Sequence, residues 1–220
     1  MEPHIMEALI NRDAETFFPD TPLRPDAFEK NDAEKIRDIE YHFAQILQTL
    51  GLDLNDDSLS GTPARVAKMF VKELFSGLNP VSKPRISLFE NKYGYHRMLI
   101  EKDITLYSCC EHHFVPIIGK AHVAYIPATQ VIGLSKINRL VQYYAKRPQV
   151  QERLTIQIAN GLKAALGHND VAVIVDADHL CVAARGIKDV QSSTVTSSYS
   201  GKFQNENTRA EFLAFVRTGK

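Results

Sequence analysis

The first clear pattern along the chain is a stripe of apolar residues that recur every three or four positions after residue 31. The stripe consists of Ile36, Ile39, Phe43, Ile46, Leu47 and Leu50. This spacing predicts an amphipathic helix, which Gly51 ends. The stretch TPARVAKMFVKELFSGL predicts a second helix, with Thr62 as its N-cap, Pro63 at its first helical position and Gly77 at its end.

After Pro84 the pattern changes to an alternation of apolar and polar residues. The stretches RISLFEN, RMLIEKDITLYS and KAHVAYIPATQVIGLS predict strands. Two helices follow, one from Ser135 to Arg147 and one from Pro148 to Leu166. DVAVIVDADHLCVAAR then predicts a strand, SSTVTSSYS its partner and NTRAEFLAFV a closing helix. This order predicts an α+β fold, an antiparallel sheet with helices on one face.

The same change in pattern divides the chain into two parts. Residues 1–84 are expected to form a helical region with a Pro-rich extension, in which the first thirty residues could include one short helix. Residues 85–220 are expected to form the domain that carries the chemistry. At 220 residues the chain is long enough for a substantial core.

Composition narrows the classes of partner and compartment. The formal net charge is zero, so there is no global basic field for nucleic acid. The apolar runs are shorter than the ~18 residues that a membrane span needs, and the N-terminus has no pattern of a secretory signal. Three cysteines, two of them adjacent, are a poor basis for a disulfide scaffold. We therefore expect a soluble cytoplasmic protein that binds neither nucleic acid nor membrane.

The stretch SCCEHHF contains two overlapping Cys-x-x-His pairs, Cys109 with His112 and Cys110 with His113. One of these pairs and the distant Cys181 would give a zinc ion three ligands and leave its fourth tetrahedral position open, as in a catalytic site. The alternative is that Cys181 is a small buried hydrophobe, which free cysteines often are.

The strand predicted around Cys181 favours the functional interpretation. Residues two apart on a strand share a face, so that His179, Cys181 and Arg185 would follow the apolar Val171, Val173, Val175 and Ala177 on one side. A possible base, a metal ligand and an anion binder would then lie in line. The alternative is that this end of the sheet is simply solvated.

Two helix starts carry further candidates. In GLSKINRLV, Ser135 is a candidate N-cap, and Lys136 and Arg139 would add two cations to a site that already favours phosphate. In RPQVQERL, Gln151 and Glu152 lie in a first turn, and a carboxylate can accept two parallel hydrogen bonds from guanine. The alternatives are a solvated basic turn and an acidic residue that only complements the helix dipole.

Together, SCCEHHF, VIGLSKINRLVQYYAKRPQVQERLT and CVAARGI resemble the GTP cyclohydrolase I family in its bacterial form, which opens folate biosynthesis. The resemblance extends to TPARVAKM and NTRAEFL and covers roughly residues 32–216. It implies a tunnelling fold, in which sheets of several subunits close into a barrel with active sites between subunits. It also implies a decamer of two pentamers that converts GTP and water to 7,8-dihydroneopterin triphosphate and formate.

Carried over position by position, the resemblance implies a role for each candidate. Zn2+ would be bound by Cys110, His113 and Cys181, and protons would be transferred by His112 and His179. The purine would be held by Ser135, Gln151 and Glu152, with Glu152 as the guanine anchor. The triphosphate would be bound by Lys136, Arg139 and Arg185, joined by Arg65 of a neighbouring subunit.

The sequence departs from the family pattern at Cys109, which doubles the usual single cysteine, and at Ala64, where relatives commonly have histidine. Strand alternation separates the two cysteines. Ile104 and Leu106 mark the inward face, which Cys110 shares, whereas Cys109 would point away from the core.

Three other functions compete with this interpretation. A zinc deaminase is disfavoured because the sequence has no Cys-x-x-Cys. A nitrile reductase of the same fold, acting on another purine, would not need the metal ligands. A zinc-stabilised guanine-nucleotide-binding protein without turnover is the alternative that the sequence excludes least well.

Overall fold

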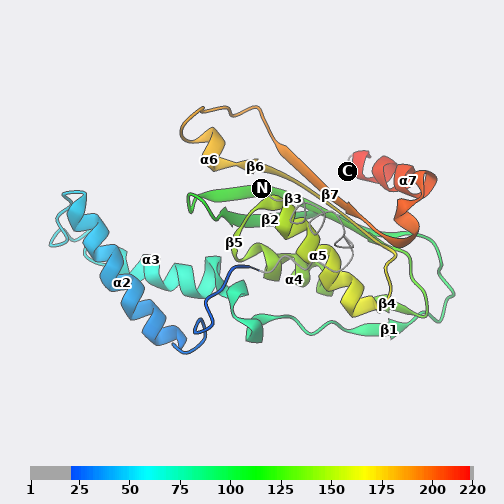
Figure 1. Ribbon diagram of the computed structural model, residues 1–220, viewed down its shortest axis with the longest axis horizontal. Coiled ribbons are helices and arrows are strands. Elements are labelled where there is room, and N and C mark those ends of the chain that lie inside the picture. Colours follow the sequence, from blue (N-terminus) through cyan, green and yellow to red (C-terminus); the bar gives the residue numbers. More distant parts are fainter. Residues whose placement is uncertain (1–20, 219–220) are drawn as a thin grey trace, which may run out of the picture.

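A five-stranded sheet forms the centre of the computed structural model, which describes residues 21–218 (Figure 1). The strands stand in the order β5-β2-β3-β6-β7, and neighbours are antiparallel except for β5 and β2. Their bounds are Pro148–Gln149 (β5), Leu99–Cys110 (β2), Pro116–Tyr125 (β3), Val171–His179 (β6) and Thr194–Tyr199 (β7). The expected antiparallel sheet is confirmed, as is the pairing of its last two strands.

A second, smaller sheet joins β1 (Leu88–Glu90) to β4 (Gln130–Ile132) in an antiparallel pair. The RISLFEN and KAHVAYIPATQVIGLS stretches therefore do form strands. The latter is split between β3 and β4, because Pro127 lies in the loop between them, where a missing backbone N–H does not interrupt a ladder.

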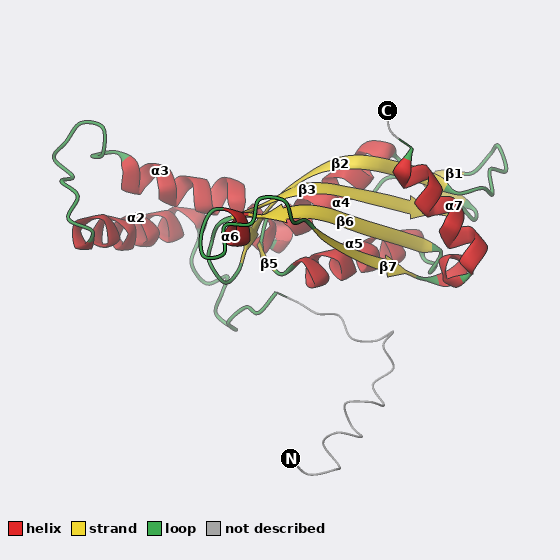
Figure 2. Ribbon diagram, turned by 90° about the horizontal axis from the view of Figure 1, so that it is seen from above, coloured by secondary structure: helices red, strands yellow, loops and turns green. Residues whose placement is uncertain are grey.

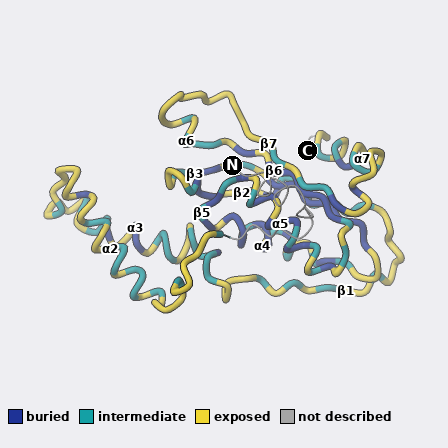
Figure 3. The backbone as a smooth tube through the Cα atoms, viewed as in Figure 1, coloured by how far each residue is buried: buried dark blue, intermediate teal, exposed yellow. Residues whose placement is uncertain are grey.

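Two helices cover one face of the main sheet. α4 (Leu134–Ala145) lies along β2, and α5 (Gln151–Leu166) lies across β6 and β7 (Figure 2). Beneath them, Val171, Val173 and Val175 are completely buried, as the alternation along this strand predicts. This layer contains most of the apolar core (Figure 3).

The closing helix α7 (Glu206–Arg217) packs on the opposite face, so the expectation that all helices share one face is wrong. Phe212 of this helix is buried against Ala172 and Ile174, whose side chains alternate with the valines beneath α5. The end of β6 that α7 covers is apolar on both faces. Such a strand needs cover on both sides, and α7 supplies the second.

The N-terminal helices α2 (Asp32–Thr49) and α3 (Thr62–Met69) pack on each other and extend beyond one end of the main sheet (Figure 2). A capping box begins α2, because the Asn31 side chain accepts from the Glu34 N–H while the Glu34 carboxylate accepts from the Asn31 N–H. The helix ends before Gly51, whose φ of +82° is the left-handed conformation that stops a helix.

The predicted starts of three helices need correction. Gly61, not Thr62, caps α3, and Gly133, not Ser135, precedes α4; neither helix has a side-chain cap. Pro148 does not begin a helix, because it pairs with Cys109 in the parallel β5–β2 ladder, and α5 starts at Gln151. In each case backbone pairing or loop geometry decides the boundary, and residue type alone does not report it.

The end of the second predicted helix also differs from expectation. After α3 the chain continues as a π-helical turn, Phe70–Leu74, and then as a 3-10 turn, Ser76–Leu78, so that Gly77 lies inside the latter. The Gly77 N–H donates to the Lys146 carbonyl just beyond α4, at 2.9 Å. This bond links the helical pair to the layer above the sheet.

The N-terminal extension is described only in part. Residues 21–30 contain a turn and no helix; residues 1–20, the rest of the segment for which one short helix was expected, lie outside the described residues. The division at residue 84 stays a prediction. Between residues 21 and 218, none of the helices combines the length and apolarity that crossing a bilayer requires.

Candidate active site

The end of β2 presents Cys110 to the core, as the alternation predicts. Ile104, Leu106 and Cys110 all belong to the buried cluster beneath α4 and α5. Cys109 is also buried, with 5% of its surface exposed, so the expectation that it points away from the core does not make it accessible. At this position β2 is flanked by β3 on one side and β5 on the other. Burial raises the pKa of the Cys109 thiol to about 11, with a smaller contribution from Cys110.

A tight turn after β2 carries the two histidines. The Phe114 N–H donates to the Cys110 carbonyl at 2.8 Å, and Phe114 itself adopts a left-handed backbone conformation with φ of +55°. The Phe114 ring packs against Phe75 and Phe70, at centroid distances of 5.4 and 6.4 Å. These aromatic contacts anchor the turn to the π-helical segment that follows α3.

Both histidines of the turn approach Cys110. The Cys110 Sγ lies 3.9 Å from His112 Nδ1 and 3.8 Å from His113 Nδ1. These two distances do not distinguish between the histidines. The third cysteine does, because Cys110, His113 and Cys181 place one potential ligand atom each within 4.8 Å of one another. Two thiols and one imidazole are a donor set that suits zinc.

Cys181 reaches this group by a route that differs from the one predicted. The strand β6 ends at His179, and Cys181 lies in the short helix α6 (Leu180–Ala183) that follows it. The predicted alternation through Arg185 is therefore wrong beyond His179. Burial and the neighbouring Cys110 thiol raise the pKa of Cys181.

His179 and Gln151 form a hydrogen-bonded pair beside the cysteines. His179 Nε2 lies 2.7 Å from Gln151 Oε1. The Gln151 amide in turn donates to the carbonyls of Val175, at 3.0 Å, and Thr194, at 2.7 Å. Burial lowers the pKa of His179, and the negative charges of Glu152 and Asp178 partly oppose that shift. Glu152 is exposed on the first turn of α5.

Arg185 is close to the group formed by Cys110, His113 and Cys181. Its Nη1 lies 3.0 Å from His113 Nε2. The guanidinium is exposed, so it is available to an anion that approaches the cysteines and histidines.

A polar contact that the sequence interpretation missed involves Glu111. Its carboxylate accepts from the Arg153 guanidinium and lies 4.0 Å from His112 Nε2. Arg153 also donates to Gln149 Oε1, at 3.0 Å, and to the Pro148 carbonyl, at 3.0 Å. Glu111 was inside the SCCEHHF stretch and could have been noticed there, but no signal in the sequence connects it to Arg153.

The basic residues of α4 do not join this group within the chain. α4 runs alongside β2, with Asn138 Nδ2 donating to Glu101 Oε1 at 3.1 Å and Gln142 Nε2 donating to the Thr105 carbonyl at 2.5 Å. Lys136 therefore lies near the start of β2, whereas Cys110 lies at its end.

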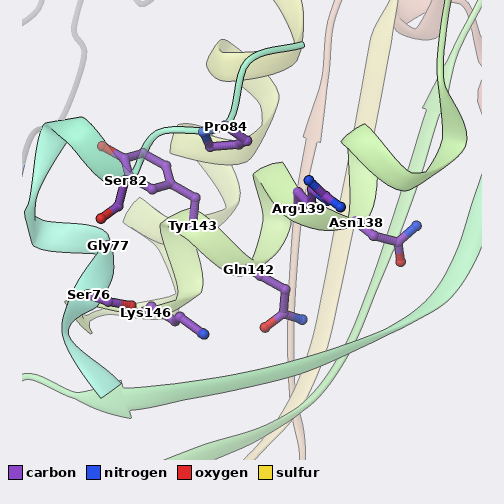
Figure 4. A pocket seen from close by; sticks show the side chains of 9 residues that line it. All are labelled: Ser76, Gly77, Ser82, Pro84, Asn138, Arg139, Gln142, Tyr143 and Lys146. Atoms are coloured by element: carbon purple, nitrogen blue, oxygen red, sulfur yellow. The ribbon is translucent and has the colours of Figure 1, made fainter. Parts of the chain in front are cut away.

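Arg139 instead lines a separate pocket of about 400 Å³ between α4 and the segment before β1 (Figure 4). Its other lining residues are Ser76, Gly77, Ser82, Pro84, Asn138, Gln142, Tyr143 and Lys146. Ser135 is exposed on the first turn of the same helix. The structure thus separates the expected triphosphate residues of α4 from the cysteines of the same chain.

Arg65 also lies apart from the cysteines. It is exposed on α3, where its guanidinium donates to the Ser58 carbonyl and to Thr62 Oγ1, both at 3.1 Å. Its expected contact with substrate was assigned to a neighbouring subunit, so the position within one chain leaves that expectation as a prediction.

Comparisons with known proteins agree with the motifs. The family model described as GTP cyclohydrolase I matches residues 39–217. GTP cyclohydrolase 1 of Flavobacterium johnsoniae is 62% identical over 196 residues, which are 89% of this chain and 88% of that protein. GTP cyclohydrolase 1 of Citrobacter koseri is 54% identical over 214 residues, covering 97% of this chain and 94% of the relative. A solved structure, the archaeosine synthase QueF-Like in the apo form, aligns with 47% of this chain at 21% identity and a TM-score of 0.39, which is too low to carry an argument.

Proposed function

Because this chain belongs to the GTP cyclohydrolase I family, we propose that it converts GTP and water to 7,8-dihydroneopterin triphosphate and formate, the opening step of tetrahydrofolate synthesis. The observation that supports this most directly is the convergence of three metal-ligand side chains with a histidine pair. Cys110, His113 and Cys181 lie next to His112, and His179 lies at the end of β6, two residues before Cys181.

We propose Zn2+ as the metal, held by Cys110, His113 and Cys181. The donor set fits, because thiolate sulfur and imidazole nitrogen are the ligands of structural and catalytic zinc sites, and three protein ligands leave a position for catalysis. When bound, the ion would supply Lewis acidity, which brings the pKa of water to about 7 and allows attack on the guanine ring near neutral pH.

The residues around the metal ligands supply the remaining parts of the chemistry. His112 has an exposed side chain, so it can reach N7 of a bound guanine and protonate it. His179, at the end of β6, is the second residue proposed to transfer protons. The exposed Glu152 carboxylate would accept from the guanine N1–H and N2–H2 donors, and the exposed Arg185 would provide a cation for the triphosphate.

The complete site would combine residues from more than one chain. Asn138 and Gln142 hold α4 beside Glu101 and Thr105, so that its Lys136 end lies toward the start of β2, whereas Cys110 is the last residue of that strand. Lys136, Arg139 and Ser135 would therefore serve a site whose cysteines belong to another copy, and Arg65 would do the same. This arrangement supports active sites between subunits, and we propose the tunnelling-fold decamer of two pentamers that the family resemblance implies as the assembly that forms them.

The test is direct chemical detection of both products. Purified zinc-loaded protein is incubated with GTP, formate is quantified, and the pterin is detected by fluorescence after oxidation. We expect equal amounts of the two, and none from Cys110→Ser. If GTP binds but neither product forms, the protein is instead a zinc-stabilised guanine-nucleotide-binding protein.

A further inference from the structure

The side-chain amide of Gln151 is engaged almost entirely by the protein itself. Only 1% of the residue is exposed. Its nitrogen donates to two main-chain carbonyls, those of Val175 at 3.0 Å and Thr194 at 2.7 Å. Its oxygen faces His179 Nε2 at 2.7 Å. A side chain in this position has no free N–H group left to offer a purine.

These contacts determine which way the amide points. Main-chain carbonyls only accept hydrogen bonds, so the group that faces Val175 and Thr194 must be the NH2 group. A flipped amide would set its oxygen against two carbonyl oxygens and leave its NH2 group against the imidazole. The oxygen therefore faces His179, and because an amide oxygen only accepts, His179 Nε2 must carry the proton.

We propose that Gln151 is a positioning residue that holds the His179 ring in one orientation, with Nε2–H toward the amide oxygen and Nδ1 turned away from it. This inference rests on the proposed function, in which His179 transfers protons. It differs from the expectation that the Gln151 side chain holds the purine. In a neutral imidazole only one nitrogen has a proton, so fixing Nε2–H leaves the lone pair of Nδ1 free.

The amide is well suited to this role because three elements hold it. Gln151 is the first residue of α5, and its two carbonyl partners belong to the neighbouring strands β6 and β7. Its own carbonyl accepts from Thr155 Oγ1 at 2.9 Å, and Thr155 is bonded at 2.7 Å to Thr196 of β7. A partner that is locked in this way keeps an imidazole in one tautomer and one orientation.

The kinetic test compares two glutamines of the same helix. Gln151→Met keeps the length of the side chain and removes the amide, while the control Gln157→Met alters another buried glutamine, whose oxygen accepts from Gln149 at 2.8 Å. We expect Gln151→Met to lower kcat ~10- to 100-fold with KM for GTP within about threefold of the parent. Gln157→Met should leave both constants near those of the parent. A KM that rises tenfold or more with kcat preserved would make Gln151 a purine contact, and unchanged constants would remove it from the mechanism; either result overturns the proposal.

A second measurement does not depend on turnover or on the folding of any Gln151 variant. Magic-angle-spinning 15N spectra of the histidine-labelled, zinc-loaded parent report which nitrogen of each ring is protonated. The His179 signals are identified as those missing from His179→Gln. The proposal requires a protonated Nε2 and an unprotonated Nδ1 for His179, and the opposite tautomer overturns it. If the parent forms no formate from GTP, the proposed function fails, while this spectrum still decides the tautomer.

Discussion

At the scale of single residues, the adjacent cysteines Cys109 and Cys110 differ in chemical reactivity. Cys110 shares a group with His113 and Cys181, whereas Cys109 is outside that group and has a pKa of about 11. A thiol becomes a metal ligand or a nucleophile as its thiolate, and burial disfavours that form. Cys109 is therefore expected to be a chemically inert buried side chain.

This difference predicts opposite results for two substitutions. Cys110→Ser should abolish zinc binding and formate release, because a hydroxyl is a poor substitute for thiolate on zinc. Cys109→Ala should keep one zinc per chain and most of the activity, with a loss of stability of ~1–2 kcal/mol from the small cavity. Metal analysis and urea unfolding of both variants measure these effects. Loss of zinc from Cys109→Ala alone would reverse the assignment of the two cysteines.

Glu152 supports a prediction about substrate recognition. Glu152→Gln removes the charge and one of two acceptors, which should weaken the interaction with guanine by ~1.5–3 kcal/mol, or about tenfold or more in kcat/KM. Zinc content should not change. The matched control is Glu206→Gln, which alters an exposed acid in the first turn of α7 and should leave GTP turnover unaffected. Equal turnover by Glu152→Gln and the parent would exclude Glu152 from the purine site.

At the scale of secondary structure, the spacing of the apolar residues correctly predicted where helices and strands occur. The predicted boundaries of these elements were less accurate. The stripe that ends at Leu50 is indeed a helix, and the alternate valines of β6 are indeed buried. Periodicity reports which residues share a face, and that is a property of the segment itself; in α2 only Leu47 of the stripe is buried within the described chain. Pro148 and Cys181 were misplaced because a two-residue parallel pairing and a four-residue helix depend on distant parts of the chain.

Gly77 allows a prediction at this scale. A Cβ atom there would lie 2.0 Å from the Tyr143 carbonyl oxygen and 2.7 Å from that of Lys146, both backbone atoms that cannot move easily. Gly77→Ala should therefore lower the free energy of unfolding by about 3 kcal/mol or more. The control is Gly51→Ala, where no atom is within 4 Å and only the φ of +82° opposes a side chain, so that about 1 kcal/mol is expected. Urea unfolding of the two variants measures the difference, and equal losses would contradict the steric argument.

At the scale of the whole molecule, the sheet separates two halves of the proposed site. Sequence motifs correctly indicated which residues belong to one family pattern, but they do not report that Lys136 lies toward the start of β2 and Cys110 at its end. This separation predicts complementation. Arg139→Ala and Cys110→Ser chains, each inactive, should regain activity when they are unfolded, mixed and refolded together. With random mixing, about a quarter of the shared sites would have both parts intact.

The matched control for complementation uses two residues from the same edge of the main sheet of one chain. His179→Ala mixed with Cys110→Ser should recover nothing, because these residues lie at the same edge of the main sheet and no chain in the mixture has both. Mass spectrometry of the mixed oligomers verifies that exchange has occurred. Recovery in this control, or none in the Arg139→Ala mixture, would mean that the residues are distributed among chains in another way.

The packing of Phe114 against Phe75 and Phe70 has a consequence for how the molecule opens. The turn that carries His112 and His113 is tied by these rings to the π-helical segment, so local unfolding of one should release the other. In hydrogen–deuterium exchange, the amides of Phe75 and Phe114, each hydrogen-bonded to a main-chain carbonyl, should exchange at one common rate. Phe114→Ala should accelerate exchange at Phe75, many residues away in sequence. The histidine turn and the helical pair would then fluctuate as one unit, with the aromatic rings as the link between them.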